Sequence, residues 1–218
     1  GSPHIAGFIR DNRELLKADL VITSDGPVAE NGRSTVVCGV RWVIGFELRA
    51  RGAARDLHSG NYAGVAPNPL WTLVHLLSTM KNPAGEITIE GFYDNVLPPT
   101  PLELEALQRL PVDEQAVKDD LGLAHFDTPL ERSYYERLSF WPTLTINGLH
   151  GGYAGPGSKT VLPHEAFTKC DIRLVEAQDV EEIFTKVEAH VRKHAPQVEF
   201  IRRGGMQPSK TPLDSPFV

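Results

Sequence analysis

Three segments of this sequence carry side chains whose types and positions favour chemistry. The first is Asp56-Leu57-His58-Ser59-Gly60, in which a histidine stands between an aspartate and a Ser-Gly turn, just past a predicted strand. A histidine so placed projects from a rigid element, as a catalytic or binding side chain must. Turn formation alone explains the same five residues about as well, so the motif by itself leaves both interpretations open.

The other two segments are centred on Arg173 and Asp25. Arg173 lies in a predicted strand among apolar neighbours. Its guanidinium either binds a carboxylate through two parallel hydrogen bonds or extends into solvent from an apolar stem. Asp25 ends an apolar strand, and in α/β sheets the residues that bind ligands and metals gather at the carboxyl ends of strands. A turn-forming aspartate before Gly26-Pro27 is the alternative for Asp25.

Other motifs match known chemistry poorly. The glycine-rich loop at 150–160 lacks the Gly-Lys-Ser/Thr order of a phosphate-binding loop, and a strand rather than a helix follows it. His164-Glu165 has no second histidine four residues later, as a zinc protease helix requires. His190 and His194 share one face of a predicted helix, which suits either a metal pair or a solvated helix end.

Composition narrows the class of protein. The 218 residues are 41% hydrophobic and 23% charged, as in an ordinary globular protein. A net charge of −6 does not favour a nucleic-acid partner. No apolar run approaches the roughly 20 residues of a membrane span, and the first residues show no signal pattern. Two distant cysteines make no disulfide framework. We therefore expect a cytoplasmic protein without nucleic-acid or membrane partners.

The elements that must position the candidate side chains alternate between strand and helix. Hydrophobic periodicity predicts strands at 18–22, 41–51, 86–90, 143–146, 167–175 and 198–202, and helices at 11–17, 69–80 and 180–191. Residues 92–140 contain short acidic helical segments, such as 102–107, which indicate an insertion into a core fold. The order predicts an α+β fold in which two helices pack on one face of an antiparallel sheet.

Six segments occur in an order that resembles a known family. They are Leu20 to Asp25, Asp56 to Gly60, Ala66-Pro67-Asn68-Pro69, Gly91 to Val96, Gly157 to Pro163, and Asp171 to Val175. The set resembles the carnosinase-like dipeptidases, a branch of the dizinc exopeptidases of peptidase family M20, which also includes desuccinylases and aminoacylases. The resemblance covers nearly the whole chain. The stretch Gly91-Phe92-Tyr93-Asp94 and the acidic insertion are what point to the dipeptidase branch.

The resemblance implies a division of the chain. Members of the family have a catalytic α/β domain that holds two zinc ions, and an inserted lid domain that dimerises. The lid is a ferredoxin-like, four-stranded antiparallel sheet with two helices packed on one face. By this resemblance, residues 1–40 are a fragment of the catalytic domain and 205–218 begin the return to it. Residues 41–204 are the lid and dimerisation domain, with a helical insertion at 92–140.

The resemblance also implies roles for four residues. Asp25 corresponds to a zinc ligand, and His58 to a lid histidine that reaches into the partner subunit's active site and polarises the scissile carbonyl. Thr160 and Arg173 correspond to lid residues that hold the C-terminal carboxylate of the substrate. The physical chemistry agrees, since an imidazole aimed at a developing oxyanion stabilises it and a guanidinium fork suits a planar carboxylate.

The expected function follows from the same resemblance. It implies two Zn²⁺ ions, or possible Mn²⁺ substitutes, in each full-length subunit, a homodimer formed through the lid, and small peptide substrates. The family's general base and remaining ligands have no counterpart in this sequence, so we expect the fragment alone to be inactive and to lack a zinc pair. Two alternatives stay open: a deacylase or desuccinylase of N-acyl amino acids, and a non-catalytic self-association module.

Overall fold

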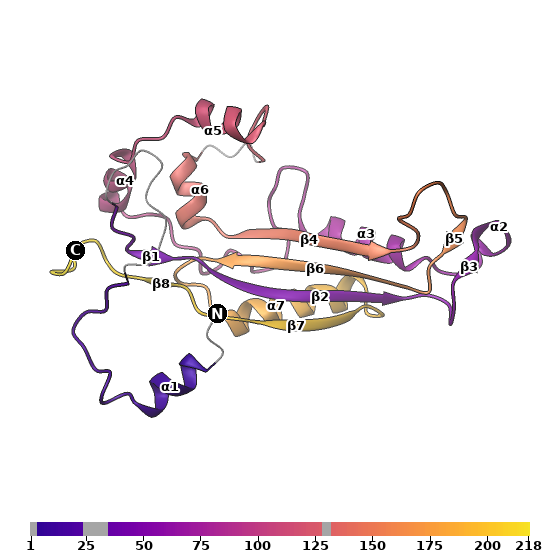
Figure 1. Cartoon of the computed structure of the whole chain (residues 1–218), viewed down its shortest axis with the longest axis horizontal. Coiled ribbons are helices and arrows are strands. Elements are labelled where there is room, and N and C mark those ends of the chain that lie inside the picture. The colour runs from indigo at the N-terminus through magenta and orange to yellow at the C-terminus, as the bar shows by residue number, and fades with distance from the viewer. Residues whose placement is uncertain (1–3, 24–34, 128–131) are drawn as a thin grey trace.

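The centre of the molecule is a four-stranded antiparallel sheet (Figure 1). The computed structural model describes residues 4–23, 35–127 and 132–218. The strand order is β4 (Thr143–Gly151), β6 (Glu165–Leu174), β2 (Trp42–Arg51) and β7 (Glu199–Gly205). Each strand pairs antiparallel with its neighbours, which confirms the predicted sheet.

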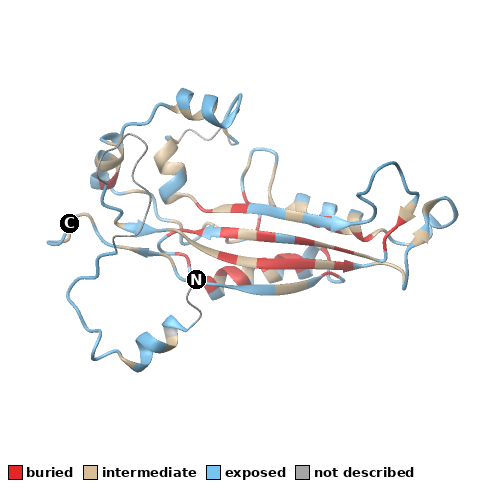
Figure 2. Ribbon diagram, viewed as in Figure 1, coloured by how far each residue is buried: buried red, intermediate tan, exposed pale blue. Residues whose placement is uncertain are grey.

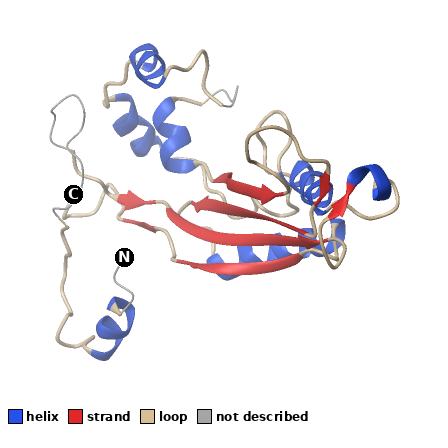
Figure 3. Ribbon diagram, turned by 45° about the vertical axis from the view of Figure 1, so that its right-hand side comes forward, coloured by secondary structure: helices blue, strands red, loops and turns tan. Residues whose placement is uncertain are grey.

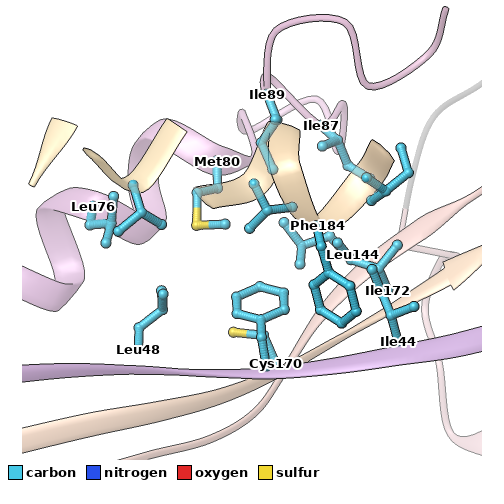
Figure 4. Packing of buried hydrophobic residues seen from close by; sticks show 14 of the residues in the cluster. Ile44, Leu48, Leu76, Met80, Ile87, Ile89, Leu144, Cys170, Ile172 and Phe184 are labelled. Atoms are coloured by element: carbon cyan, nitrogen blue, oxygen red, sulfur yellow. The ribbon is translucent and has the colours of Figure 1, made fainter. Parts of the chain in front are cut away.

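Alternation along the two central strands explains why they lie in the middle of the sheet. The buried side chains of one face are Ile44, Phe46, Leu48 and Ala50 in β2, and Ala166, Cys170, Ile172 and Leu174 in β6. Helices α3 (Pro69–Met80) and α7 (Val180–His194) cover this face and contribute to the same apolar core. Figure 4 shows this packing, and Figure 2 shows burial concentrated along the middle of the sheet.

Both covering helices begin where the sequence predicts. The Asn68 side chain accepts a hydrogen bond from the Leu70 N–H at the start of α3, and Pro69 occupies the first turn. At the start of α7, Asp179 accepts from the N–H groups of Glu181 and Glu182. Basic side chains in the last turn of α7 complement the helix dipole.

Residues 92–140 are largely helical in the described part of the chain, as expected. They contain α4 (Pro101–Gln108), α5 (Glu114–Leu121) and α6 (Tyr134–Phe140), and they lie beside the end of the sheet where β4 begins (Figure 1). Thr100 and Ser133 form capping boxes at the starts of α4 and α6. The Arg41 guanidinium donates to the Trp141 carbonyl at 3.1 Å, which ties the insertion to the start of β2.

The predicted strand at 86–90 is wrong. Ile87 takes part in a single isolated bridge with Lys81, and no strand of the described chain pairs along this segment. Ile87 and Ile89 are nevertheless buried in the core. Figure 4 shows their side chains beside the helices, on the side away from the sheet. The period-two pattern therefore reflects burial of an extended segment against helices rather than pairing in a sheet.

The predictions before residue 41 also differ from the structure. A helix forms at α1 (Ile5–Asp11) rather than at 11–17, and residues 18–22 form no strand. Val21 and Ile22 are exposed, at 78% and 79%. No strand in the described part of the chain lies beside them to bury their side chains. Two short strands, β1 (Gly39–Val40) and β8 (Ser209–Lys210), pair at the base of the sheet.

Candidate functional site

A two-stranded ribbon brings His58 and Thr160 together. Strand β3 (Leu57–His58) pairs antiparallel with β5 (Val161–Leu162), and helix α2 (Ser59–Tyr62) follows β3. The ribbon extends past one end of the four-stranded sheet (Figure 3). The His58 Nε2 atom lies 3.0 Å from the Thr160 hydroxyl, although the two residues are 102 positions apart in the sequence. Both side chains are exposed, so a ligand can reach them.

The backbone beside His58 selects one form of its ring. The Gly60 N–H donates to Nδ1 of His58 at 3.0 Å, so Nδ1 carries no proton in the neutral ring and Nε2 carries the N–H. This N–H points at the Thr160 hydroxyl. A Cβ at Gly60 would lie 2.9 Å from the imidazole, which explains the glycine after Ser59. The arrangement presents a hydrogen-bond donor and a hydroxyl side by side.

Asp56 and His164 join the two backbone segments at the base of this ribbon, where it meets the sheet. One carboxylate oxygen of Asp56 accepts from the backbone N–H of His164 at 2.9 Å and from its ring Nδ1 at 2.7 Å. Donation from the ring, and then from the backbone N–H, lowers the pKa of Asp56. The sequence singled out His164 only as half of a zinc motif. Its contact with Asp56 has no signal in the sequence, because the two residues meet only through the fold.

Arg173 lies at the opposite end of the sheet. It pairs with Val43 on one side and with Thr143 on the other, and eight residues of strand at about 3.3 Å each place it roughly 26 Å from Glu165. Its side chain is exposed and forms no ion pair within the residues that the structure describes. Burial, and then the charge of Arg173, lower the pKa of Arg41. One subunit therefore does not unite Arg173 with His58 and Thr160.

The remaining predicted site residue, Asp25, lies outside the described residues. Its role as a metal ligand stays a prediction. Across residues 4–23, 35–127 and 132–218, no group of three or more histidine, cysteine, aspartate or glutamate side chains is arranged to hold a metal ion. The rings of His190 and His194 are tilted against each other with centroids 4.3 Å apart, but Nε2 of His190 already lies 2.9 Å from the Thr79 hydroxyl.

One charged residue on the open face of the sheet is buried rather than solvated. Glu47 is 1% exposed, between Arg49 at 2.8 Å and Arg203 at 2.7 Å. Hydrogen bonds from Arg49 and then Arg203 lower the pKa of Glu47. Alternation placed Glu47 correctly on the face away from the helices, but it could not show that arginines from β2 and β7 cover it.

The two edges of the sheet differ in character. Strand β4 carries no Asp, Glu, Lys or Arg side chain, and Ile146 and Leu149 are 52% and 42% exposed. Helix α3, which packs on β6 and β2, exposes Trp71 and Val74 to solvent. At the other edge, Arg202 of β7 forms ion pairs with the helix α7 beside it. Charged side chains protect an edge from pairing with another chain, so the β4 edge is the one suited to a partner.

None of the helices in the described part of the chain is long and apolar enough to cross a membrane.

Comparison with known proteins gives a consistent match. Residues 39–199 match the peptidase dimerisation domain of the M20 family. The chain is 31% identical over 195 residues to the Cys-Gly metallodipeptidase dug1 of Schizosaccharomyces pombe, covering 88% of this chain and 41% of that protein. It is 27% identical over 173 residues to the human Beta-Ala-His dipeptidase, covering 79% of this chain and 34% of that protein. The chain thus spans about two fifths or less of these relatives.

Solved structures show the same likeness. An M20 family metallo-carboxypeptidase from Sulfolobus solfataricus aligns with a TM-score of 0.90 and 34% identity, over 96% of this chain and 55% of that chain. Human carnosine dipeptidase 1 aligns with a TM-score of 0.74 and 25% identity, over 82% of this chain and 40% of that chain. The matched residues 39–199 include the β3–β5 ribbon and Arg173.

Proposed function

Because this chain belongs to the M20 peptidase family, through its dimerisation domain, we propose that it is the lid and dimerisation part of a metal-dependent dipeptidase. The observation that carries the proposal is the His58–Thr160 pair on a ribbon that extends beyond the sheet. In this proposal, residues 41–204 form the lid, with an insertion at 92–140. Residues 1–40 and 205–218 are edges of a catalytic domain.

The partner in the proposed dimer is a second copy of this chain, paired along β4. Support comes from the uncharged β4 edge and from the exposed Trp71 and Val74 on the neighbouring helix α3. Two-fold antiparallel pairing of β4 satisfies the free backbone groups of both edges and buries both apolar helix faces.

Such pairing supports a composite substrate site. Within one chain, Gly151 of β4 lies beside the ribbon end of β6, and Thr143 lies beside Arg173. An antiparallel β4 pair places the Gly151 end of one strand next to the Thr143 end of the other. The ribbon of one subunit therefore approaches the Arg173 end of its partner. The two groups can then contact one substrate, although the two ends of β6 are roughly 26 Å apart within one chain.

Each group then has a role that suits its chemistry. In the substrate complex, the Nε2–H of His58 turns from the Thr160 hydroxyl to the carbonyl oxygen of the scissile amide, whose negative charge grows in the transition state. Thr160, beside it, donates a hydroxyl to the substrate carboxylate. Arg173 of the other subunit holds the same carboxylate with its guanidinium fork, and Arg41 adds positive charge nearby. This division between subunits explains why neither end of the sheet carries a complete site.

The metal belongs to the proposed catalytic domain. We propose that two zinc ions bind there, with manganese as the alternative, and that Asp25 supplies one ligand. The metallodipeptidase relatives support a metal, whereas the described residues hold no metal cluster of their own. We also infer a cytoplasmic location, which cell fractionation tests.

Mixed dimers of the full-length enzyme test the composite site. His58→Ala and Arg173→Ala homodimers are each expected to have a strongly reduced kcat/KM. When subunits of the two variants are exchanged, one site of each heterodimer contains an intact Arg173 and the partner's intact His58. About half of the wild-type kcat/KM should return per heterodimer. Absence of recovery, with heterodimers verified by mass spectrometry, would contradict a site shared between subunits.

A substrate panel tests the reaction class. Dipeptides and N-acyl amino acids both place a carboxylate near a scissile amide, so both fit the proposed roles of Arg173 and Thr160. We expect the full-length enzyme to turn over dipeptides faster. Preference for N-acyl amino acids would instead identify a deacylase. Full activity of His58→Ala would favour a lid that serves only for self-association.

A further inference from the structure

The β3–β5 ribbon has few interactions of its own for an element that carries a proposed catalytic side chain. Each of its strands contains two residues, and an isolated two-stranded ribbon is marginally stable in water. The ribbon lies beyond the end of the four-stranded sheet (Figure 1). The direction of the His58 ring therefore depends on what holds the base of the ribbon.

His164 is bound on two sides at that base. Its carbonyl accepts from the Gly52 N–H at 2.7 Å. Its own N–H and its ring Nδ1 both donate to one oxygen of Asp56, at 2.9 and 2.7 Å. Asp56 immediately precedes β3, and His164 follows β5 after Pro163. These three hydrogen bonds join the backbone segment that leads into β3 to the segment that follows β5.

The geometry of this contact matters more than its charge. The side chains of His164 and Asp56 are 59% and 53% exposed, so solvent screens the attraction between them. Two donors from one residue converging on one oxygen nevertheless fix the direction of the Asp56 side chain. If the His164 ring only balanced the charge of Asp56, its Nδ1 atom would not need to face the carboxylate.

We propose that Asp56 and His164 are positioning residues, which hold His58 and Thr160 in the geometry that binds the substrate. The inference rests on the proposed function, because it assumes that the Nε2–H of His58 acts on the substrate. Displacing a catalytic group by about 1 Å can cost as much as a hundredfold in rate. Loss of the contact is therefore expected to lower kcat by roughly tenfold and to change KM less.

Two substitutions of His164 provide the test in the full-length enzyme. His164→Ala removes the ring donor and should lower kcat, whereas His164→Asn places an amide N–H close to the position of Nδ1 and should restore most of it. Asp127→Ala is the matched control, since it removes another exposed ion pair, with Lys81 at 3.2 Å, in the insertion. It should leave kcat unchanged.

A spectroscopic measurement on the 218-residue chain is independent of activity. In the unsubstituted chain and in His164→Asn, the ring ¹⁵N spectrum of neutral His58 should show the Nε2–H form, with slow exchange of that proton. In His164→Ala, exchange should accelerate while the unfolding midpoint of the main sheet stays the same.

The outcomes separate this inference from the proposed function. If His58→Ala is fully active, the proposed function fails. If His58→Ala is inactive but His164→Ala has normal kcat and normal His58 exchange, the positioning inference alone is overturned. Equal impairment of His164→Ala and His164→Asn would also overturn it, because the Nδ1 donor would then not be the group that matters.

Discussion

The two ends of β6 present different chemistry. At the Glu165 end, the ribbon carries an imidazole N–H and a hydroxyl, held by hydrogen bonds in the described structure. At the Leu174 end, the exposed Arg173 lies near the half-buried Arg41 and has no ion-pair partner among the described residues. One end can stabilise a developing negative charge, and the other can hold a formal negative charge.

This difference shows why a dimer is needed for the proposed chemistry. A dipeptide has its scissile carbonyl a few ångströms from its carboxylate, whereas the two ends of β6 are roughly 26 Å apart. In the proposed dimer, opposite ends of two different subunits act on the same substrate. The edge that pairs the subunits is therefore as much a part of the proposed site as the side chains.

The largest expected effect is the loss of peptide hydrolysis in the 218-residue chain, which contains the groups at both ends of β6. The 218-residue chain contains His58, Thr160 and Arg173, yet we expect it to hydrolyse no dipeptide and to bind no pair of zinc ions, because the described residues provide no metal cluster. Peptide turnover and metal content of the purified chain measure this. Clear hydrolysis would show that the two ends suffice without a catalytic domain.

The next largest effects come from substitutions at the two ends of β6 in the full-length enzyme, which should change different kinetic constants. His58→Ala should lower kcat by about 10²–10³, since it removes a donor that acts on transition-state charge. Arg173→Ala should instead raise KM, by roughly tenfold or more, because it removes binding of a carboxylate present throughout. Arg173→Lys should not restore KM, since lysine lacks the planar fork. Identical effects of both alanine variants on kcat and KM would contradict the separate roles of His58 and Arg173.

A third prediction concerns the edge that brings the ends together. Ile146→Lys places a charge on the exposed β4 edge and should weaken dimerisation of the chain by at least about tenfold. Leu149→Lys should act in the same direction. Arg202→Ala on the β7 edge is the control and should leave the dimer intact. Light scattering over a range of concentrations measures the result, and dissociation by the β7 control alone would place the interface at the other edge.

The smallest expected effect lies between the two ends. Glu47→Gln keeps the size of the side chain but removes its charge beside Arg49 and Arg203, and should reduce the free energy of unfolding by about 1–3 kcal/mol at neutral pH. The arginines lower the pKa of folded Glu47. Its contribution is therefore present above the ordinary glutamate pKa and lost as the pH falls through the folded value.

Urea unfolding at several pH values measures this contribution. The difference between the unsubstituted chain and Glu47→Gln should shrink as the pH is lowered below the ordinary glutamate range. Kinetic constants of the full-length Glu47→Gln enzyme should stay close to normal, since Glu47 lies at neither end. A constant difference across the pH range would show that the charge of Glu47 is not what stabilises the sheet.

Much of the lid was predictable from local pattern. The helix at 69–80 was confirmed with its Asn68 cap, and the predicted strands at 41–51 and 167–175 correspond closely to β2 and β6. These elements bury one face against a single core, so their periodicity records their structure directly. The segment at 86–90 shows the same period without a strand, because burial against helices leaves a similar pattern.

The candidate site was predictable only in part. The Asp56–Gly60 motif drew attention to His58 from its residue types alone, and strand position did the same for Arg173, whereas only the resemblance to the dizinc exopeptidases added Thr160. No local pattern could pair His58 with Thr160 or Asp56 with His164, since each pair is more than 100 positions apart. The roles of the four predicted residues remain proposals, and Asp25 lies outside the described structure.

The sequence by itself determined the fold class, the family resemblance and the residue types at the site. Those depend on side-chain periodicity, caps and motif order, which are local properties of the chain. The ends of the sheet that the groups occupy, the tautomer of His58 and the unprotected sheet edge became visible only in the folded chain. Those properties depend on strand pairing and register, which bring together residues that are far apart in the sequence.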